Sequence, residues 1–353
     1  MDMQLNGVRP DLATFNAVLY SLSRMVTFRR APNLALQTLT EMKNVGIEPS
    51  LASWKYLLAV FYPNESSDSN MLYKVMDELE GREFELRHVD DVEFFVNAMK
   101  ICCQNLHDVE LAFRVDELLN TGDNAALLGD SRLVNIYYSF FLRLVFTFET
   151  LDTIMDVYQR VTPHLWTPNL TVLEELLKAI ELQDGYRHLP LIWTDLLLFE
   201  FLRREDLLER LLQLMAKQKQ EPDLQRQYAH IAGQLIQRWN EEREAGRDPV
   251  LSTGHMVSHI LAIAENAGDH DLAWTMFDIY RKNKNAFSGT PTDSSLQRLV
   301  SGCLERGDGE RAVAVVNFMN TLDMAGVGDV AQSVLDSDKV ALTEQQREIL
   351  ASL

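Results

Sequence analysis

Apolar residues recur at helical spacing along most of the chain. Between residues 12 and 25, Phe15, Leu19 and Leu22 stand three or four positions apart, which places them on one face of a helix. Similar stripes follow, separated by short segments rich in Gly, Pro and Asp. The pattern predicts helices over residues 12–25, 33–45, 51–62, 71–80, 90–103, 108–121, 131–145, 149–161, 170–182, 187–201, 252–266, 270–283, 293–305 and 309–324.

One phrase occurs twice at the joints between these helices. MQLNGVRPD at residues 3–11 returns as MKNVGIEPS at residues 42–50, 39 positions later. In each copy the glycine fits a left-handed helix end, the proline cannot extend the old helix, and the last residue can accept an N–H of the new one. The corresponding positions are Gly7 and Gly46, Pro10 and Pro49, and Asp11 and Ser50.

Near the C-terminal end of the chain, a different joint between helices repeats with the same period. The dipeptide Gly268-Asp269 matches Gly307-Asp308, again 39 positions apart. A period near 40 with two helices per copy predicts an all-α solenoid of helical hairpins. The first phrase resembles the tail of a helix whose start is absent, so we expect the chain to be part of a longer array.

The regularity of the stripes varies along the chain and suggests four parts. Residues 1–203 read as helical hairpin repeats, and residues 204–249 as irregular helices followed by a charged linker. Two further hairpins are expected within 250–325. Residues 326–353 are acidic and read as a C-terminal cap or tail.

Composition and charge narrow the function. The chain has 353 residues, 46% of them hydrophobic, and a formal charge of −19. Residues 1–50 carry five basic and four acidic side chains, a net of +1, so the remainder carries −20. Indiscriminate binding of nucleic acid needs clustered Lys and Arg, so any RNA contact is expected near the N-terminal repeat. The acidic remainder suits solvent or a basic protein partner.

The residue patterns predict no catalytic, metal or cofactor site. His255 and His259 are four apart, but no third ligand and no neighbouring Glu complete a zinc motif. The adjacent pair Cys102-Cys103 lacks metal-ligand spacing. Three cysteines in all cannot form a disulfide framework, which favours a reducing or matrix-like compartment. We therefore expect no enzyme and no small-molecule substrate. No apolar run is long enough to span a membrane.

A hairpin with a G-[IV]-x-P-[DS] ending, followed by a Thr/Ser-aromatic pair, resembles the pentatricopeptide repeat. Thr14-Phe15 and Ser53-Trp54 are the two pairs here. The resemblance is specific over residues 1–60 and implies a right-handed superhelical solenoid that associates with RNA. The chain is most similar to members of this family in the small subunit of the mitochondrial ribosome. This implies a matrix location, a role in translation, and small-subunit proteins, rRNA and mRNA as partners.

The same resemblance points to RNA-binding candidates. Family members read one base per repeat with the fifth residue of the first helix and the last residue of the repeat. These positions fall on Asn16 and Ser50, and on Lys55 and Leu86 in the next repeat. Leu86 has no polar group, so one readable repeat remains and sequence specificity is not expected.

The loop between the first two helices adds Arg29 and Arg30, whose place suits a phosphate contact. For both arginines the alternative is an ordinary solvated loop. For Asn16 it is a surface helix position, and for Ser50 a simple N-cap. A second function stays open: a protein-only interaction scaffold of the tetratricopeptide kind, favoured by the −20 of residues 51–353.

Overall fold

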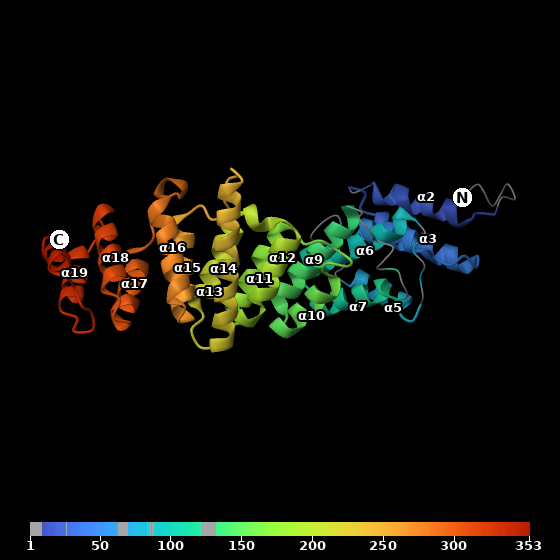
Figure 1. Ribbon diagram of the computed structural model, residues 1–353. Helices are drawn as coiled ribbons and strands as arrows, with labels where there is room; N and C mark the ends of the chain where they lie inside the picture. Colours follow the sequence, from blue (N-terminus) through green and yellow to red (C-terminus); the bar gives the residue numbers. More distant parts are fainter. Residues whose placement is uncertain are drawn as a thin grey trace. The chain divides into compact units, whose positions relative to one another are not determined.

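The computed structural model describes residues 9–25, 27–62, 70–82, 84, 86, 88–121, 124 and 132–353 (Figure 1). Within these residues the chain forms helices and no strand, and its one β-type contact is an isolated bridge between Thr253 and Ser288. This confirms the all-α class and the helical hairpins. The chain divides into two compact units, Met1–Ala179 and Ile180–Leu353.

Helices of the first unit start and end close to the predicted positions. They are α2 (Leu12–Ser23), α3 (Ala31–Asn44), α4 (Leu51–Phe61), α5 (Met71–Leu79), α6 (Val89–Ile101), α7 (Val109–Leu119), α9 (Arg132–Phe148) and α10 (Leu151–Val161), with α11 (Leu170–Leu182) at the boundary. One difference follows α6, where Cys102–Leu106 forms a π-helical turn before the chain reverses at His107, whose φ is 51°. The predicted loop over residues 63–70 and helix end at Gly122 lie largely outside the described residues.

The second unit continues the same pattern. Its helices are α12 (Leu189–Leu198), α13 (Glu205–Lys217), α14 (Pro222–Glu244), α15 (Gly254–Asn266), α16 (His270–Lys282), α17 (Asp293–Glu305), α18 (Gly309–Thr321), α19 (Val327–Leu335) and α20 (Glu344–Ala351). Residues 204–249 hold the two helices α13 and α14, and α14 extends to Glu244, into the part of this segment that the sequence suggested as a charged linker. The acidic residues 326–353 hold two short helices.

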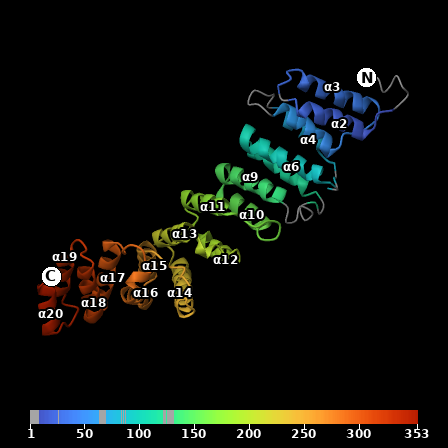
Figure 2. The ribbon, with the colours of Figure 1, turned by 90° about the horizontal axis from the view of Figure 1, so that it is seen from above.

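Successive hairpins pack through equivalent helices. In the first unit α2 lies against α4, α4 against α6, and α6 against α9, as Figure 2 shows. In the second unit α13, α15 and α17 lie side by side in the same way. The predicted stripe of Phe15, Leu19 and Leu22 is buried in this stack. Each first helix therefore contributes its apolar stripe to a continuous core.

Polar side chains link neighbouring hairpins at the repeat period. Among the ion pairs of the described residues, five examples join side chains 35 to 44 positions apart within one unit. They connect Lys43 to Glu78, Arg114 to Asp77, Arg160 to Asp116, Lys217 to Glu181, and Arg311 to Asp271. Apart from Asp116, which is buried, these side chains are partly or largely exposed, so each of the other four pairs adds about 0–1 kcal/mol and mainly fixes the register of one hairpin on the next.

The Gly–Pro joint forms as predicted at its second copy. Gly46 has φ of +78°, and its N–H donates to Lys43 O at 3.0 Å while Ile47 N–H donates to Met42 O at 3.1 Å. This pair of bonds is the Schellman motif, which needs the left-handed residue. Ser50 then caps α4 in a reciprocal capping box with Ser53. Gly7, at the first copy, lies outside the described residues.

The two Gly-Asp joints lie between helices, where the sequence placed them. Gly268 and Gly307 have φ of +69° and +75° and end α15 and α17. The aspartates that follow, Asp269 and Asp308, accept the N–H groups of Leu272 and Arg311 at the starts of α16 and α18. Ala273 and Ala312, in matching register, are fully buried where the paired helices meet.

The start of α15 is tightly packed against the loop that leads to α17. Ser288 N–H donates to Ser252 O at 2.7 Å, and Gly254 N–H donates to Ser288 O at 2.8 Å. A Cβ on Gly254 would stand 2.4 Å from the carbonyl carbon of Thr290. Because that neighbour is backbone, it cannot rotate away, so this position requires glycine.

We expect Gly254→Ala to lower the free energy of unfolding by about 1–3 kcal/mol, as overpacking does. The matched control is Gly233→Ala on α14, where the nearest atom would be a Leu272 methyl carbon at 3.9 Å. That change should stabilise by about 0.5–1 kcal/mol, since alanine favours the helix interior. Thermal and urea unfolding followed by circular dichroism measures both. Equal effects of the two variants would contradict this account.

Glu265 on α15 carries a carboxyl group whose surroundings disfavour its charged form. Its Oε1 is buried without a hydrogen-bond partner among the described residues. Burial raises the pKa of Glu265 to about 7, and the nearby Arg298 offsets only part of this effect. The folded protein therefore holds this proton more tightly than the unfolded chain, whose Glu titrates near 4.5.

Because the folded state binds this proton more tightly, the free energy of unfolding should fall as pH rises from about 4.5 through about 7. Glu265→Gln removes the charge, so it should stabilise at pH 8 by about 1–2 kcal/mol, after allowance for partial exposure, and have little effect at pH 4.5. Urea unfolding of both proteins at the two pH values measures the difference. A stabilisation that does not change with pH would rule out titration of Glu265 as its source.

Candidate nucleic-acid interface

Asn16 and Ser50 meet at the first complete joint between repeats. Asn16 lies on α2, and Ser50 is the N-cap of α4. The Asn16 amide Nδ2 donates to Ser50 Oγ at 3.4 Å, and Ser53 Oγ donates to Asn16 Oδ1 at 2.6 Å. The two candidates, 34 residues apart in sequence, thus form one half-buried polar cluster together with the capping box.

This cluster retains hydrogen-bonding capacity. A side-chain amide has two N–H donors and an oxygen with two lone pairs. The contacts with Ser50 and Ser53 use one donor and one lone pair, and both Asn16 and Ser50 are partly exposed. The amide is therefore held in a fixed orientation and can still bond the edge of a base. The same contacts also serve the fold, because they tie α2 to the start of α4.

Lys55 is placed differently. Its side chain is 8% exposed, and the ammonium donates to Asp90 Oδ1 at 2.6 Å and Glu93 Oε2 at 2.8 Å on α6. Burial alone would lower the pKa of Lys55, but the two carboxylates outweigh it and the pKa is raised. This trio carries a net charge of −1, so the ammonium links two hairpins and presents little positive potential to solvent.

Arg29 and Arg30 lie in the turn between α2 and α3. Both are exposed, and neither forms an ion pair with a described residue. Their guanidinium groups are free to contact a phosphate or an acidic protein group. The structure does not bring them to the Asn16–Ser50 cluster: Asn16 lies in the N-terminal half of α2, whereas both arginines follow its C-terminal end.

Tyr20 belongs to the same surface, although the repeat pattern did not single it out. It lies one helical turn beyond Asn16 on α2, and 51% of it is exposed. Its ring packs edge-to-face against Tyr56 of α4, with centroids 5.5 Å apart. The sequence signal that could have identified Tyr20 is its position: it is an aromatic residue outside the apolar stripe of α2, four positions after the candidate Asn16.

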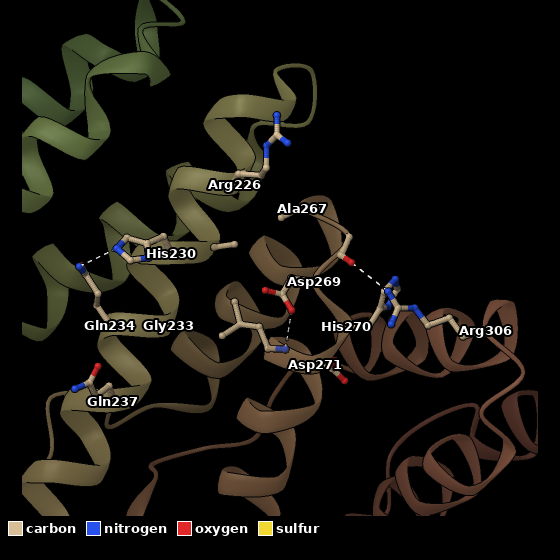
Figure 3. A pocket seen from close by; sticks show the side chains of 13 residues that line it. Arg226, His230, Gly233, Gln234, Gln237, Ala267, Asp269, His270, Asp271 and Arg306 are labelled. Atoms are coloured by element: carbon tan, nitrogen blue, oxygen red, sulfur yellow. Dashed lines mark hydrogen bonds between the residues drawn. The ribbon is translucent and has the colours of Figure 1, made fainter.

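The second unit holds a polar hollow of about 720 Å³ between α14 and the α15–α16 turn. Figure 3 shows the side chains that line it. Many of their polar groups are occupied: Arg306 donates to Gly268 O, and Asp271 pairs with Arg311. Trp193 donates to Gln234, whose amide bonds His230. Positive and negative side chains are balanced here, so the hollow has no clear preference for a charged ligand.

Among the described residues, no group of three or more His, Cys, Asp or Glu side chains lies close enough together to hold a metal ion. No helix among them is long and apolar enough to cross a membrane. The pKa of His259 is lowered by burial, against the opposing influence of Glu209, so this histidine favours the neutral form.

The described residues form stacked helical hairpins, with Asn16 and Ser50 side by side next to the Gly–Pro joint at Gly46, an arrangement similar to that of helical-repeat proteins of the pentatricopeptide type. Comparison with known proteins supports this class: residues 1–64 match the pentatricopeptide repeat domain profile.

The particular relatives are ribosomal. The chain is 33% identical over 323 residues to small ribosomal subunit protein mS39 of Drosophila melanogaster, covering 90% of the chain and 49% of the relative. It is 34% identical over 354 residues to mS39 of Xenopus laevis, covering 99% and 51%. It is 32% identical over 356 residues to mS39 of Mus musculus, covering 99% and 50%. The chain spans about half the length of these curated relatives. The family resemblance inferred from the sequence is confirmed.

One solved structure that aligns with the chain is the pentatricopeptide repeat protein PPR10 from maize. The alignment covers 99% of this chain and 49% of the PPR10 chain. The sequence identity of PPR10 to this chain is 16%, and the TM-score is 0.33.

The internal role of Lys55 can be tested by stability. We expect Lys55→Met to lower the free energy of unfolding by about 1–2 kcal/mol, because Asp90 and Glu93 lose a shared charged donor. Arg29→Met is the control and should change it by less than about 0.5 kcal/mol, since that side chain is exposed. Urea unfolding measures both. If Lys55→Met has no more effect than the control, the ammonium does not hold the hairpins together.

Proposed function

We propose that this chain is part of a non-catalytic RNA-associated component of the small subunit of the mitochondrial ribosome. It would reside in the matrix and support translation through contacts with ribosomal proteins, rRNA and mRNA. The observation that carries the proposal is the 32–34% identity to mS39 proteins over 90–99% of the chain. A second support is the Asn16–Ser50 cluster, which offers hydrogen bonds at a repeat joint.

A protein-only scaffold is the second candidate function, and two observations favour it. Residues 51–353 carry a net charge of −20, which repels a polyanion. Lys55, the candidate cation of the second repeat, is neutralised by two carboxylates. Under this alternative the chain would bind basic ribosomal proteins and make no RNA contact of its own.

Assembly is tested by sedimentation of a mitochondrial extract. The protein in its natural length should migrate with the small ribosomal subunit on a sucrose gradient. Mild nuclease treatment should shift it toward the top if RNA contributes to its attachment. Migration outside the small-subunit fraction without nuclease would refute the ribosomal assignment. Attachment that withstands complete RNA digestion would favour the protein-only scaffold.

Direct RNA binding is tested by electrophoretic shift with single-stranded RNA. We expect the triple variant Asn16→Ala, Arg29→Ala, Arg30→Ala to bind about tenfold more weakly at 150 mM salt, a typical loss when a few phosphate and base contacts are removed together. If both arginines contact phosphates, the slope of log K against log salt should become shallower by about 1.4.

The matched control replaces Arg204 and Arg247, two exposed arginines of the second unit, with alanine. We expect no change in affinity or in the salt slope. If the triple variant behaves like this control, Asn16, Arg29 and Arg30 are not part of the binding surface.

A further inference from the structure

Tyr20 is a large aromatic side chain that the structure leaves half in solvent. With 51% exposure it is among the more exposed large side chains of the first hairpin. Its one ring contact with a described residue is edge-to-face with Tyr56, at an interplanar angle of 68°. Such a contact orients a ring while leaving much of its surface uncovered.

The orientation of Tyr20 is supported through three helices. Tyr56 is partly buried on α4, and the Lys55 ammonium stands 4.5 Å from the centroid of its ring. Lys55 is in turn fixed by Asp90 and Glu93 of α6. Tyr56 is thus a positioning residue for Tyr20. A ring already held in place loses little conformational freedom when it binds a partner.

The neighbours of Tyr20 along α2 define the kind of partner. Asn16, Tyr20 and Arg24 are spaced by four residues, which puts them on one side of the helix at about 6 Å intervals along its axis. They offer an amide, a ring face and a guanidinium. Arg24 is exposed and forms no ion pair with a described residue.

A nucleotide of single-stranded RNA presents the complementary groups. Its base has a polar edge that an amide can bond, a flat face that stacks on an aromatic ring, and a phosphate that attracts a guanidinium. A protein helix docking here would instead need a continuous apolar stripe. The polar and cationic neighbours of Tyr20 favour RNA.

We propose that Tyr20 is a stacking platform for an unpaired RNA base at the joint of the first two repeats, with Arg24 contacting the adjoining phosphate. This inference rests on the proposed RNA association and adds to it a binding residue outside the repeat's base-reading positions. Stacking tolerates any base, so the platform provides affinity without sequence preference.

The test uses single-stranded RNA that contains 2-aminopurine, whose fluorescence is quenched when it stacks. Binding of the unaltered protein should quench the probe at one position of the oligonucleotide. Tyr20→Leu should abolish that quenching and weaken binding about tenfold, as expected when one stacking contact is lost. Tyr20→Phe keeps the ring and should retain both signals. The control Phe148→Leu removes another half-exposed ring, 53% exposed, and should change neither.

Tyr56 is tested through its effect on Tyr20. Tyr56→Leu should reduce the quenching, and Tyr56→Phe should restore it, because the edge-to-face contact needs the ring and not the hydroxyl. Helix content and the unfolding midpoint of each variant, measured by circular dichroism, identify a loss caused by misfolding.

The outcomes separate the two proposals. If the unaltered protein binds the RNA while Tyr20→Leu keeps both affinity and quenching, the platform is refuted and the RNA association stands. If the unaltered protein does not bind single-stranded RNA, both are refuted.

Discussion

The structure depends on burial between neighbouring hairpins. A two-helix hairpin alone cannot cover its apolar stripe, so each hairpin is stable only when the next one covers it. This explains why contacts recur at about the length of one repeat. The first helix of each hairpin packs against the first helix of the next, and ion pairs join residues 35 to 44 positions apart. It also explains why the joints need residues that fix the angle of the turn. A hairpin that turned at the wrong angle would expose the stripe of its neighbour.

Local features were therefore readable from the sequence. Gly46 and Ser50 act through atoms within a few residues, and the left-handed glycine and the capping serine formed as their residue types require. The same holds for Gly268 and Gly307. The apolar stripes predicted the helices for a similar reason, since three- and four-residue spacing of apolar residues is a property of a single segment. The π-helical turn after α6 carried no such signal and was not predicted.

Long-range features could not be read in this way. Lys55 was a candidate RNA contact because its register in the repeat matched a base-reading position. Its neutralisation depends on Asp90 and Glu93, which are 35 and 38 residues away and belong to a helix whose rotation the sequence does not give. Tyr20 depends in the same way on Tyr56 across the α2–α4 contact. The Asn16–Ser50 contact was foreseeable only because the family resemblance paired the two positions.

The charge of the chain limits how RNA can contribute. With −20 distributed over residues 51–353, each further nucleotide drawn along the repeats would meet repulsion, so the proposed contact would remain local to the first hairpins. A site of one nucleotide binds weakly by itself. When the same chain is also anchored to protein, however, the RNA contact becomes intramolecular, and its effective concentration rises to about the millimolar range. Weak stacking and a few hydrogen bonds are then sufficient. On this argument the acidic repeats and the proposed RNA site are complementary: the repeats suit basic protein surfaces, and anchorage there would make a small, sequence-tolerant RNA contact useful.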